Sequence, residues 1–200
     1  MKIILINDEK KDLAEYIEAI KNVDEGVMIR GFRVADAYRD IVTNEIGNLS
    51  FPVMVEGKRI HARTFGTFEV YIDGIPVASK YNKTRELFAY LIDKNGTMAD
   101  IHEIQTALWE GDTTEHTSYF KNLRADMIAT LEAKGVGDVL VRQHGRMGII
   151  PDMIDCDYFD MLSGSERAIR MYNGEYMSQY SWAEFTNGTL MGIKEEYMSR

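Results

Sequence analysis

Apolar residues follow two different spacings along the first 46 positions of the chain. A continuous apolar stretch over residues 3–6 is typical of a short, buried parallel strand, and the largely apolar segment over residues 27–32 predicts a second strand. After each stretch, apolar residues recur every three or four positions, which is the spacing of an amphipathic helix. These helical positions are Leu13, Tyr16, Ile17 and Ile20, then Ala35, Tyr38, Ile41, Val42 and Ile46. The pattern predicts a small βαβα unit over residues 1–46.

The next segment changes from irregular spacing to alternation. Residues 47–60 contain glycine and proline without a sustained period, so they predict a linker. Residues 64–77 alternate and include an Asp73-Gly74 pair, which is typical of a β-hairpin. We therefore place a second domain at residues 61–152, beginning with this hairpin.

Three helices and another hairpin are predicted for the rest of that domain. The first helix ends near Gly96, and the second opens on a capping box formed by Asp100 and Glu103. The third helix, over residues 114–134, has Thr113 or Thr114 as its cap and ends near Gly135. Residues 139–150 predict two strands around a turn at His144-Gly145. The apolar positions expected to face inward are Leu87, Phe88, Leu91 and Ile92 in the first helix, Ile104, Leu108 and Trp109 in the second, and Phe120, Leu123, Met127 and Leu131 in the third.

A hairpin, three helices and a hairpin are the elements of a winged helix-turn-helix, taken in that order. Residues 153–200 predict a helical hairpin dense in aromatic and methionine side chains. We expect this extension to pack on the winged helix, and an exposed surface for another protein is the alternative. The fold class predicted for the whole chain is α+β.

Composition narrows the function classes. The chain is 45% hydrophobic and 28% charged, which is typical of a globular protein, and no apolar run is long enough to span a membrane. One cysteine, Cys156, excludes an intrachain disulfide and a cysteine-rich zinc site, and the default location is the cytoplasm. The net charge of −9 argues against coating nucleic acid by bulk charge. Residues 151–200 hold much of the acid, with 4 basic and 9 acidic side chains.

Several short motifs resemble one family of bacterial regulators. These are Thr64-Phe65-Gly66-Thr67-Phe68-Glu69-Val70, Thr84-Arg85-Glu86-Leu87-Phe88-Ala89-Tyr90-Leu91, Asn122-Leu123-Arg124, Asp155-Cys156-Asp157-Tyr158-Phe159 and Tyr172-Asn173-Gly174-Glu175-Tyr176. The chain resembles OmpR/PhoB-type winged-helix response regulators of the antibiotic-regulatory-protein type. In that type a bacterial transcriptional activation domain follows the winged helix, and here only a fragment of it remains.

The first 32 residues are similar to the start of a receiver domain. In that family two adjacent acids hold magnesium, whereas this chain has Asn7-Asp8. The resemblance breaks off after the second strand, so the phosphorylatable aspartate of a receiver has no counterpart here. The resemblance implies a truncated receiver-like unit without control by aspartyl phosphorylation.

The third helix and the last hairpin carry the candidate DNA contacts. Short polar side chains that face outward reach base edges, and cations around them hold phosphates. The candidates are Lys80, Lys83, Arg85, Thr117, Ser118, Tyr119, Lys121, Asn122, Arg124, Arg142, His144 and Arg146. The alternative is a merely solvated helix face, because the charges of helix 114–134 sum to zero. Arg124, which lies near the apolar side, has a structural ion pair as its alternative role.

We therefore predict a sequence-specific transcription regulator that binds double-stranded DNA as a homodimer. RNA polymerase or a related regulator is a further candidate partner. The alternative is a protein-interaction module that scaffolds or titrates a related regulator without binding DNA. No nucleophile and base are paired, the histidines lack metal-ligand spacing, and no dinucleotide loop is present, so we expect no enzyme activity, cofactor or metal.

Overall fold

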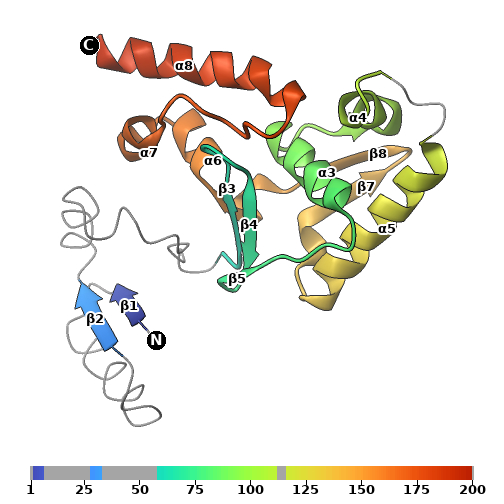
Figure 1. Cartoon of the computed structure of the whole chain (residues 1–200), viewed down its shortest axis with the longest axis horizontal. Helices are drawn as coiled ribbons and strands as arrows, with labels where there is room; N and C mark the ends of the chain where they lie inside the picture. Colours follow the sequence, from blue (N-terminus) through green and yellow to red (C-terminus); the bar gives the residue numbers. More distant parts are fainter. Residues whose placement is uncertain (1, 7–27, 33–57, 112–115, 200) are drawn as a thin grey trace. The chain divides into compact units, whose positions relative to one another are not determined.

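A computed structural model describes residues 2–6, 28–32, 58–111 and 116–199 of the chain (Figure 1). The chain divides into two compact units, Met1–Phe51 and Pro52–Arg200. The described residues form small sheets and helices, so the fold is mixed α+β, as predicted.

In the first unit, two strands are described. Strand β1 (Lys2–Ile6) pairs in parallel with β2 (Met28–Phe32), with Lys2 opposite Met28 and Ile6 opposite Phe32. The two predicted strands are thus confirmed. The helices predicted around residues 13–20 and 35–46, and nearly all of the predicted linker, lie outside the described residues.

The second unit opens with a four-stranded sheet in the order β5-β4-β3-β9. Its strands are β3 (Ile60–Arg63), β4 (Glu69–Ile72), β5 (Ile75–Pro76) and β9 (Ile154–Cys156). Asp73 and Gly74 both have positive φ, 50° and 75°, so the predicted Asp-Gly turn is confirmed between β4 and β5. Since β3 begins at Ile60, the last position of the predicted linker belongs to the sheet.

The hairpin predicted over residues 64–77 is wrong in its first part, because residues 64–68 leave the sheet. The N–H groups of Thr64 and Phe65 donate to the carboxylate of Asp157, at 2.9 and 3.1 Å. Gly66 exchanges backbone hydrogen bonds with residues 175–178, donating to the carbonyl of Glu175 and accepting from the N–H of Ser178. These partners lie about a hundred positions away in the sequence, so the alternation of residues 64–68 could not indicate them.

The extension after residue 152 was expected to be helical, but it begins as a strand. Strand β9 pairs in parallel with β3, with Ile60 opposite Ile154 and Ala62 opposite Cys156. All four of these side chains are buried. A parallel partner so distant in sequence is not visible in a three-residue pattern. The extension and the predicted winged-helix domain share this sheet, and both lie in the same compact unit.

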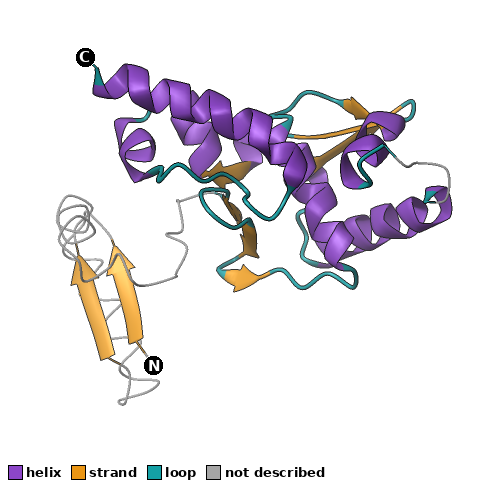
Figure 2. Cartoon of the chain, turned by 45° about the horizontal axis from the view of Figure 1, so that its top comes forward, coloured by secondary structure: helices purple, strands orange, loops and turns teal. Residues whose placement is uncertain are grey.

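Three helices follow the first sheet, as predicted. They are α3 (Asn82–Asp93), α4 (Ile101–Leu108) and α5 (Thr117–Ala133), shown in Figure 2. The capping box at the start of α4 is confirmed, since the Asp100 side chain accepts a hydrogen bond from the N–H of Glu103 at 2.8 Å. The start of α5 was predicted too early. His116 occupies its N-cap position, and Thr113 and Thr114 lie outside the described residues.

A three-stranded sheet in the order β6-β8-β7 completes this part. It consists of β6 (Ala99–Asp100), β7 (Leu140–Gln143) and β8 (Arg146–Ile149). His144 and Gly145 have φ of 47° and 79°, values typical of the tight turn that joins two hairpin strands, so the predicted hairpin is confirmed. The short strand β6 was not predicted.

The C-terminal extension contains α6 (Asp157–Leu162), α7 (Glu166–Met171) and α8 (Glu184–Met198). Single 3-10 turns lie at Gly137–Val139, Pro151–Met153 and Ser181–Ala183. Tyr172 and Tyr176 are fully buried in the core that the extension shares with the preceding helices. The Tyr176 hydroxyl donates to Asp93 of α3, and the Trp182 ring lies edge-on to that of Tyr90 at 5.2 Å. The expected packing of the extension is thus confirmed.

Candidate nucleic-acid interface

Helix α5 has one apolar face and one polar face. Phe120, Leu123, Met127 and Leu131 are buried in the core, as the spacing predicts. The side chains predicted to point outward are exposed, namely Ser118, Lys121, Asn122 and Ala125. Among the described residues of the second unit, the polar face of α5 is therefore exposed.

Asp126, in the middle of α5, connects this helix to α3 and to the loop before it. Its carboxylate accepts hydrogen bonds from the Thr84 hydroxyl at 2.6 Å and from the N–H of Lys80 at 3.1 Å. Thr84 is 2% exposed, and a buried hydroxyl needs a hydrogen-bond partner within the protein, which here is Asp126. The two contacts fix the rotation of α5 about its own axis, and with it the direction of the exposed face.

Arg59 holds the C-terminal end of α5. Its guanidinium donates to the carbonyl oxygens of Lys134 at 2.9 Å and Gly135 at 3.1 Å. The same group makes a two-pronged contact with the carboxylate of Asp73, at 2.8 and 2.6 Å. The hydrogen bonding that Arg59 donates to Asp73 raises the pKa of Arg59 and lowers the pKa of Asp73. Arg59, which directly precedes β3, thus links the four-stranded sheet to carbonyl groups at the end of the helix.

Aromatic contacts position the N-terminal end of α5. The His116 ring stacks on that of Trp109 with ring centres 4.6 Å apart and planes 7° from parallel. Tyr119 lies edge-on to Tyr81 at 5.6 Å and to Trp109 at 6.1 Å. His116 is half-buried, and its side chain makes no capping hydrogen bond.

The β7–β8 hairpin lies at the start of α4. Asp100 pairs with Arg146, and the N–H of Ile101 donates to the carbonyl of Gly145 at 3.1 Å. Met147, Gly148 and Ile149 are buried, whereas Arg142, His144 and Arg146 are exposed. The hairpin is therefore anchored through β8 while its turn and its two arginines remain accessible.

The cations predicted at the start of α3 differ in their surroundings. Lys83 is half-buried, pairs with Glu86 at 2.7 Å and donates to the carbonyl of Leu108 at 2.6 Å. Its charge is therefore already neutralised within the chain. Lys80 is exposed, with its ammonium 5.3 Å from the centre of the Tyr81 ring. Arg85 is also exposed.

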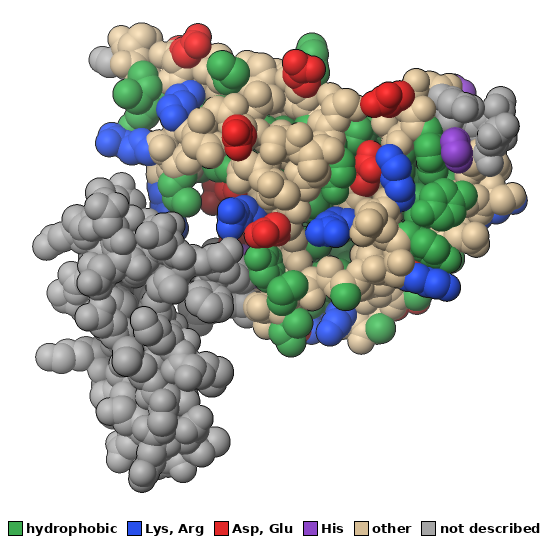
Figure 3. Space-filling view, viewed as in Figure 1, with side chains coloured by type: hydrophobic (Ala, Val, Ile, Leu, Met, Phe, Trp, Pro, Cys, Tyr) green, Lys and Arg blue, Asp and Glu red, His purple; other side chains and the backbone are tan. Residues whose placement is uncertain are grey.

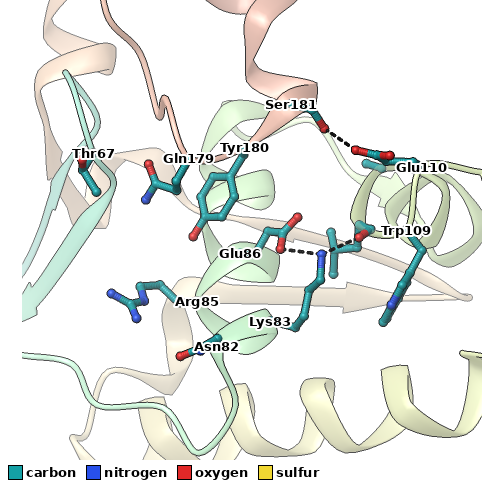
Figure 4. Close-up of a pocket in the computed structure, with 12 residues that line it drawn as sticks. Thr67, Asn82, Lys83, Arg85, Glu86, Trp109, Glu110, Gln179, Tyr180 and Ser181 are labelled. Atoms are coloured by element: carbon teal, nitrogen blue, oxygen red, sulfur yellow. Dashed lines mark hydrogen bonds and ion pairs between the residues drawn. The ribbon is translucent and has the colours of Figure 1, made fainter.

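Arg85 and Lys83 line a groove of about 600 Å³. As Figure 4 shows, the groove lies between the start of α3, the end of α4 and the segment around Tyr180. Ser181 donates to Glu110 across it at 3.1 Å. Burial raises the pKa of Tyr180 to about 12, so its hydroxyl remains protonated at neutral pH. Residues from the extension thus form one wall beside the cations of α3.

Three other predicted residues lie on or beside the exposed face of α5. Thr117 is exposed, whereas Tyr119 and Arg124 are half-buried. The alternative role predicted for Arg124 was a structural ion pair. Among the described residues, no acidic side chain forms an ion pair with Arg124. Sequence reasoning missed Arg59, because 75 and 76 positions separate it from the carbonyls it holds and no local motif marks such a contact.

Other kinds of site are not evident in the part of the chain that the structure describes. Within it, no three histidine, cysteine or acidic side chains are grouped to hold a metal ion. Cys156 is buried, and desolvation raises its pKa well above the usual value, which disfavours the thiolate form. Among the described helices, none is both long and apolar enough to cross a bilayer.

Comparison with known proteins identifies a shared fold. No protein-family model and no curated protein matches the sequence. Among solved structures, Mycobacterium tuberculosis EmbR in complex with a low-affinity phosphopeptide has a similar fold. The TM-score is 0.54 at 21% sequence identity, over 68% of this chain and 43% of the EmbR chain. This chain therefore spans less than half of the EmbR chain, and the likeness concerns the fold alone.

Proposed function

We propose that this protein is a bacterial transcription regulator that binds specific DNA sequences through a winged helix. Helix α5 enters the major groove, and the β7–β8 hairpin meets the adjoining groove or backbone. The observation that carries the proposal is the exposed polar face of α5, whose direction Asp126 fixes relative to α3. The EmbR-like fold supports a protein of the regulator type.

The exposed side chains of α5 match the chemistry of base edges. Asn122 is suited to two hydrogen bonds with adenine, and Lys121 is suited to donate to the acceptors of guanine. Ser118 is short enough to let the helix approach closely, and Thr117 and Tyr119 lie where backbone phosphates would pass. Arg142, His144 and Arg146 supply contacts from the hairpin. Lys80 and Arg85 supply phosphate contacts at α3, where Lys83 contributes less because Glu86 neutralises it.

The proposed regulator acts in the cytoplasm as a homodimer on double-stranded DNA. Two copies would bind half-sites about one helical turn apart. Since the first unit resembles a receiver without its phosphorylatable aspartate, the proposal includes no control by aspartyl phosphorylation. RNA polymerase or a related regulator is a further proposed partner, and no catalytic activity is assigned.

Selection of genomic fragments with the purified full chain, at two salt concentrations, tests the proposal. We expect a limited set of fragments to share a sequence motif and to remain bound at the higher salt. Lys121→Ala and Asn122→Ala should each weaken binding to the selected duplex about tenfold, since a good base contact contributes about 1–3 kcal/mol. Arg167→Ala, which removes an exposed cation of α7, is the matched control. Equal binding by all variants would refute the assignment.

The second candidate is an interaction module that scaffolds or titrates a related regulator. The net charge of −9 and the internal pairing of Lys83 favour it, because both reduce attraction to phosphate. This candidate predicts co-purification with a related regulator and no retention of genomic fragments at low salt. Retention of a specific fragment would eliminate it.

A further inference from the structure

Helix α8 leaves large apolar side chains in solvent. Phe185 is 87% exposed, Met198 69% and Met191 44%. The opposite side of the helix is packed, with Leu190 fully buried and Ile193 and Tyr197 against the core. Because α8 already has a buried side, the exposed side is not needed to attach it to the unit. Exposed apolar side chains gathered on one element are typical of a surface that binds another protein.

Two glycines lie on this exposed side, one helical turn apart. Gly188 and Gly192 follow Phe185 at spacings of three and seven residues, so the three share one line along the helix. A Cβ atom added at either glycine would meet no atom within 4 Å. The surface along this line is therefore low and open, which allows the backbone of another helix to approach closely. Met191 and Met198 lie beside the line on the exposed side, about 120° and 140° around the helix from Phe185, and Glu195 lies between them and Phe185. We name Phe185, Gly188, Met191, Gly192 and Met198 the α8 outer face.

The charges around the α8 outer face are acidic. Glu184 and Glu195 are exposed. The only cation of the helix, Lys194, is half-buried and donates to the carbonyl of Tyr172 on the inner side. Figure 3 shows acidic and hydrophobic side chains together along the upper edge of the view, over α8. A partner that buries Phe185 must therefore tolerate, or complement, negative charge.

We propose that the α8 outer face docks an amphipathic helix of another protein, in which lysine or arginine flanks an apolar stripe. Charge complementarity selects this occupant, because a second copy of α8 would bring its own acids against Glu184 and Glu195. Phe185 is the anchor, and Met191 and Met198 adapt to the shape of the stripe. The 15 residues of α8 are about 22 Å long, enough for about four turns of a partner helix.

The docking surface shares no residue with the proposed DNA interface. Helix α8 and helix α5 lie on different sides of the second unit (Figure 1, Figure 2). None of the residues of the α8 outer face is among the proposed DNA contacts. The inference therefore goes beyond the proposed function and does not depend on it.

Titration of the full chain against two synthetic helical peptides tests the inference. One fluorescent peptide carries a leucine stripe flanked by lysine, and its twin has glutamate in place of every lysine. We expect the lysine peptide to bind, more weakly as salt is raised, and the glutamate peptide not to bind. Phe185→Ala should weaken binding about tenfold, the usual loss for a buried aromatic anchor. Since Phe185 is almost fully exposed, this variant should fold like the wild type.

Three further variants separate docking from general charge attraction. Glu195→Lys should weaken binding of the lysine peptide, and Gly192→Ala should weaken it by blocking close approach. Ile75→Ala removes an exposed apolar side chain, 58% exposed, from the first sheet and should leave binding unchanged. Equal binding of both peptides, equal binding by Phe185→Ala and the wild type, or the same loss in Ile75→Ala would overturn the inference. Self-association of the wild-type chain would also overturn the inference if Phe185→Ala abolished that self-association.

Discussion

The hydroxyl of Thr84 donates a 2.6 Å hydrogen bond to the carboxylate of Asp126, and this contact joins α3 to α5. Thr84 is buried, whereas Asp126 lies half-buried beside the exposed face of α5. A charged acceptor makes such a hydrogen bond short and strong. The pair therefore sets how the candidate recognition helix sits on the rest of the unit.

Removing the acceptor should destabilise the fold. Asp126→Ala leaves the buried Thr84 hydroxyl without a partner, so we expect the free energy of unfolding to fall by about 1–3 kcal/mol. Asp126→Asn keeps an acceptor oxygen and should lose less. Urea unfolding followed by circular dichroism measures both. If Asp126→Ala costs much less unfolding free energy in the Thr84→Val background than in the wild type, the loss comes from the Thr84–Asp126 pair. An unchanged difference would contradict it.

The hairpin arginines should contribute phosphate contacts. Arg142→Ala and Arg146→Ala should each lower the slope of log K against log salt concentration by about one, because each contact releases about one counterion. Fluorescence anisotropy with a selected duplex measures the slope. Gln143→Ala, at an exposed neutral position of the same hairpin, is the matched control. Slopes equal to the wild type in both arginine variants would place the hairpin away from DNA.

Buried Asp93 should make stability depend on pH. Burial raises the pKa of Asp93, although hydrogen bonds from Thr186 and Tyr176 oppose the shift. The folded chain therefore holds this proton more tightly than the unfolded chain. The resulting penalty is absent when both states are protonated, and it grows as pH rises from the ordinary aspartate pKa to the raised pKa of the folded chain. Asp93→Asn should thus gain stability relative to wild type as pH rises above the ordinary aspartate pKa of about 4.

Asp73 provides a comparison of opposite sign. The hydrogen bond from Arg59 lowers the pKa of Asp73, so its contribution to stability is present above the ordinary aspartate pKa and is lost as pH falls through the lowered pKa. Asp73→Asn should accordingly lose stability relative to wild type as pH rises. Urea unfolding over a pH series gives both differences. Slopes of the same sign for the two variants would contradict these assignments.

The glycines of α8 should lower the stability of the chain. Gly188→Ala and Gly192→Ala should each raise the free energy of unfolding by about 0.5–1 kcal/mol, because alanine is the better helix former and both positions have open space. Gly145→Ala, at a position with φ of 79°, should instead destabilise the hairpin. Thermal unfolding shows whether each variant gains or loses stability relative to the wild type. A loss of stability in the α8 variants would mean that these positions are not open.

Local patterns predicted the elements that depend on neighbouring residues. Apolar spacing predicted α3, α4 and α5 and the buried side chains of α5, because a helix buries every third or fourth residue. Short motifs predicted one helix cap and two turns, because each motif acts on the backbone within a few residues. The cap is formed by Asp100 and Glu103, and the turns are Asp73-Gly74 and His144-Gly145.

Contacts between distant residues could not be predicted. Residues 64–68 alternate like a strand, yet they lie outside the sheet. The N–H groups of Thr64 and Phe65 donate to the carboxylate of Asp157 instead of to a neighbouring strand. Lys83 was a candidate phosphate contact, yet Glu86 and the carbonyl of Leu108 already bind its ammonium. Asp157 and Leu108 are brought close only by folding, whereas Glu86 lies one helical turn from Lys83, so that pairing was open to prediction from the spacing.

The sequence by itself determined which segments of the second unit form helices, turns and the last hairpin, since these follow from interactions within a few residues. Only the tertiary structure decided that β9 joins β3 and that Asp126 and Arg59 orient α5. It also decided that Phe185 remains in solvent. Hydrogen-bond partners and burial depend on which distant segments come into contact, and a local sequence pattern does not specify those contacts.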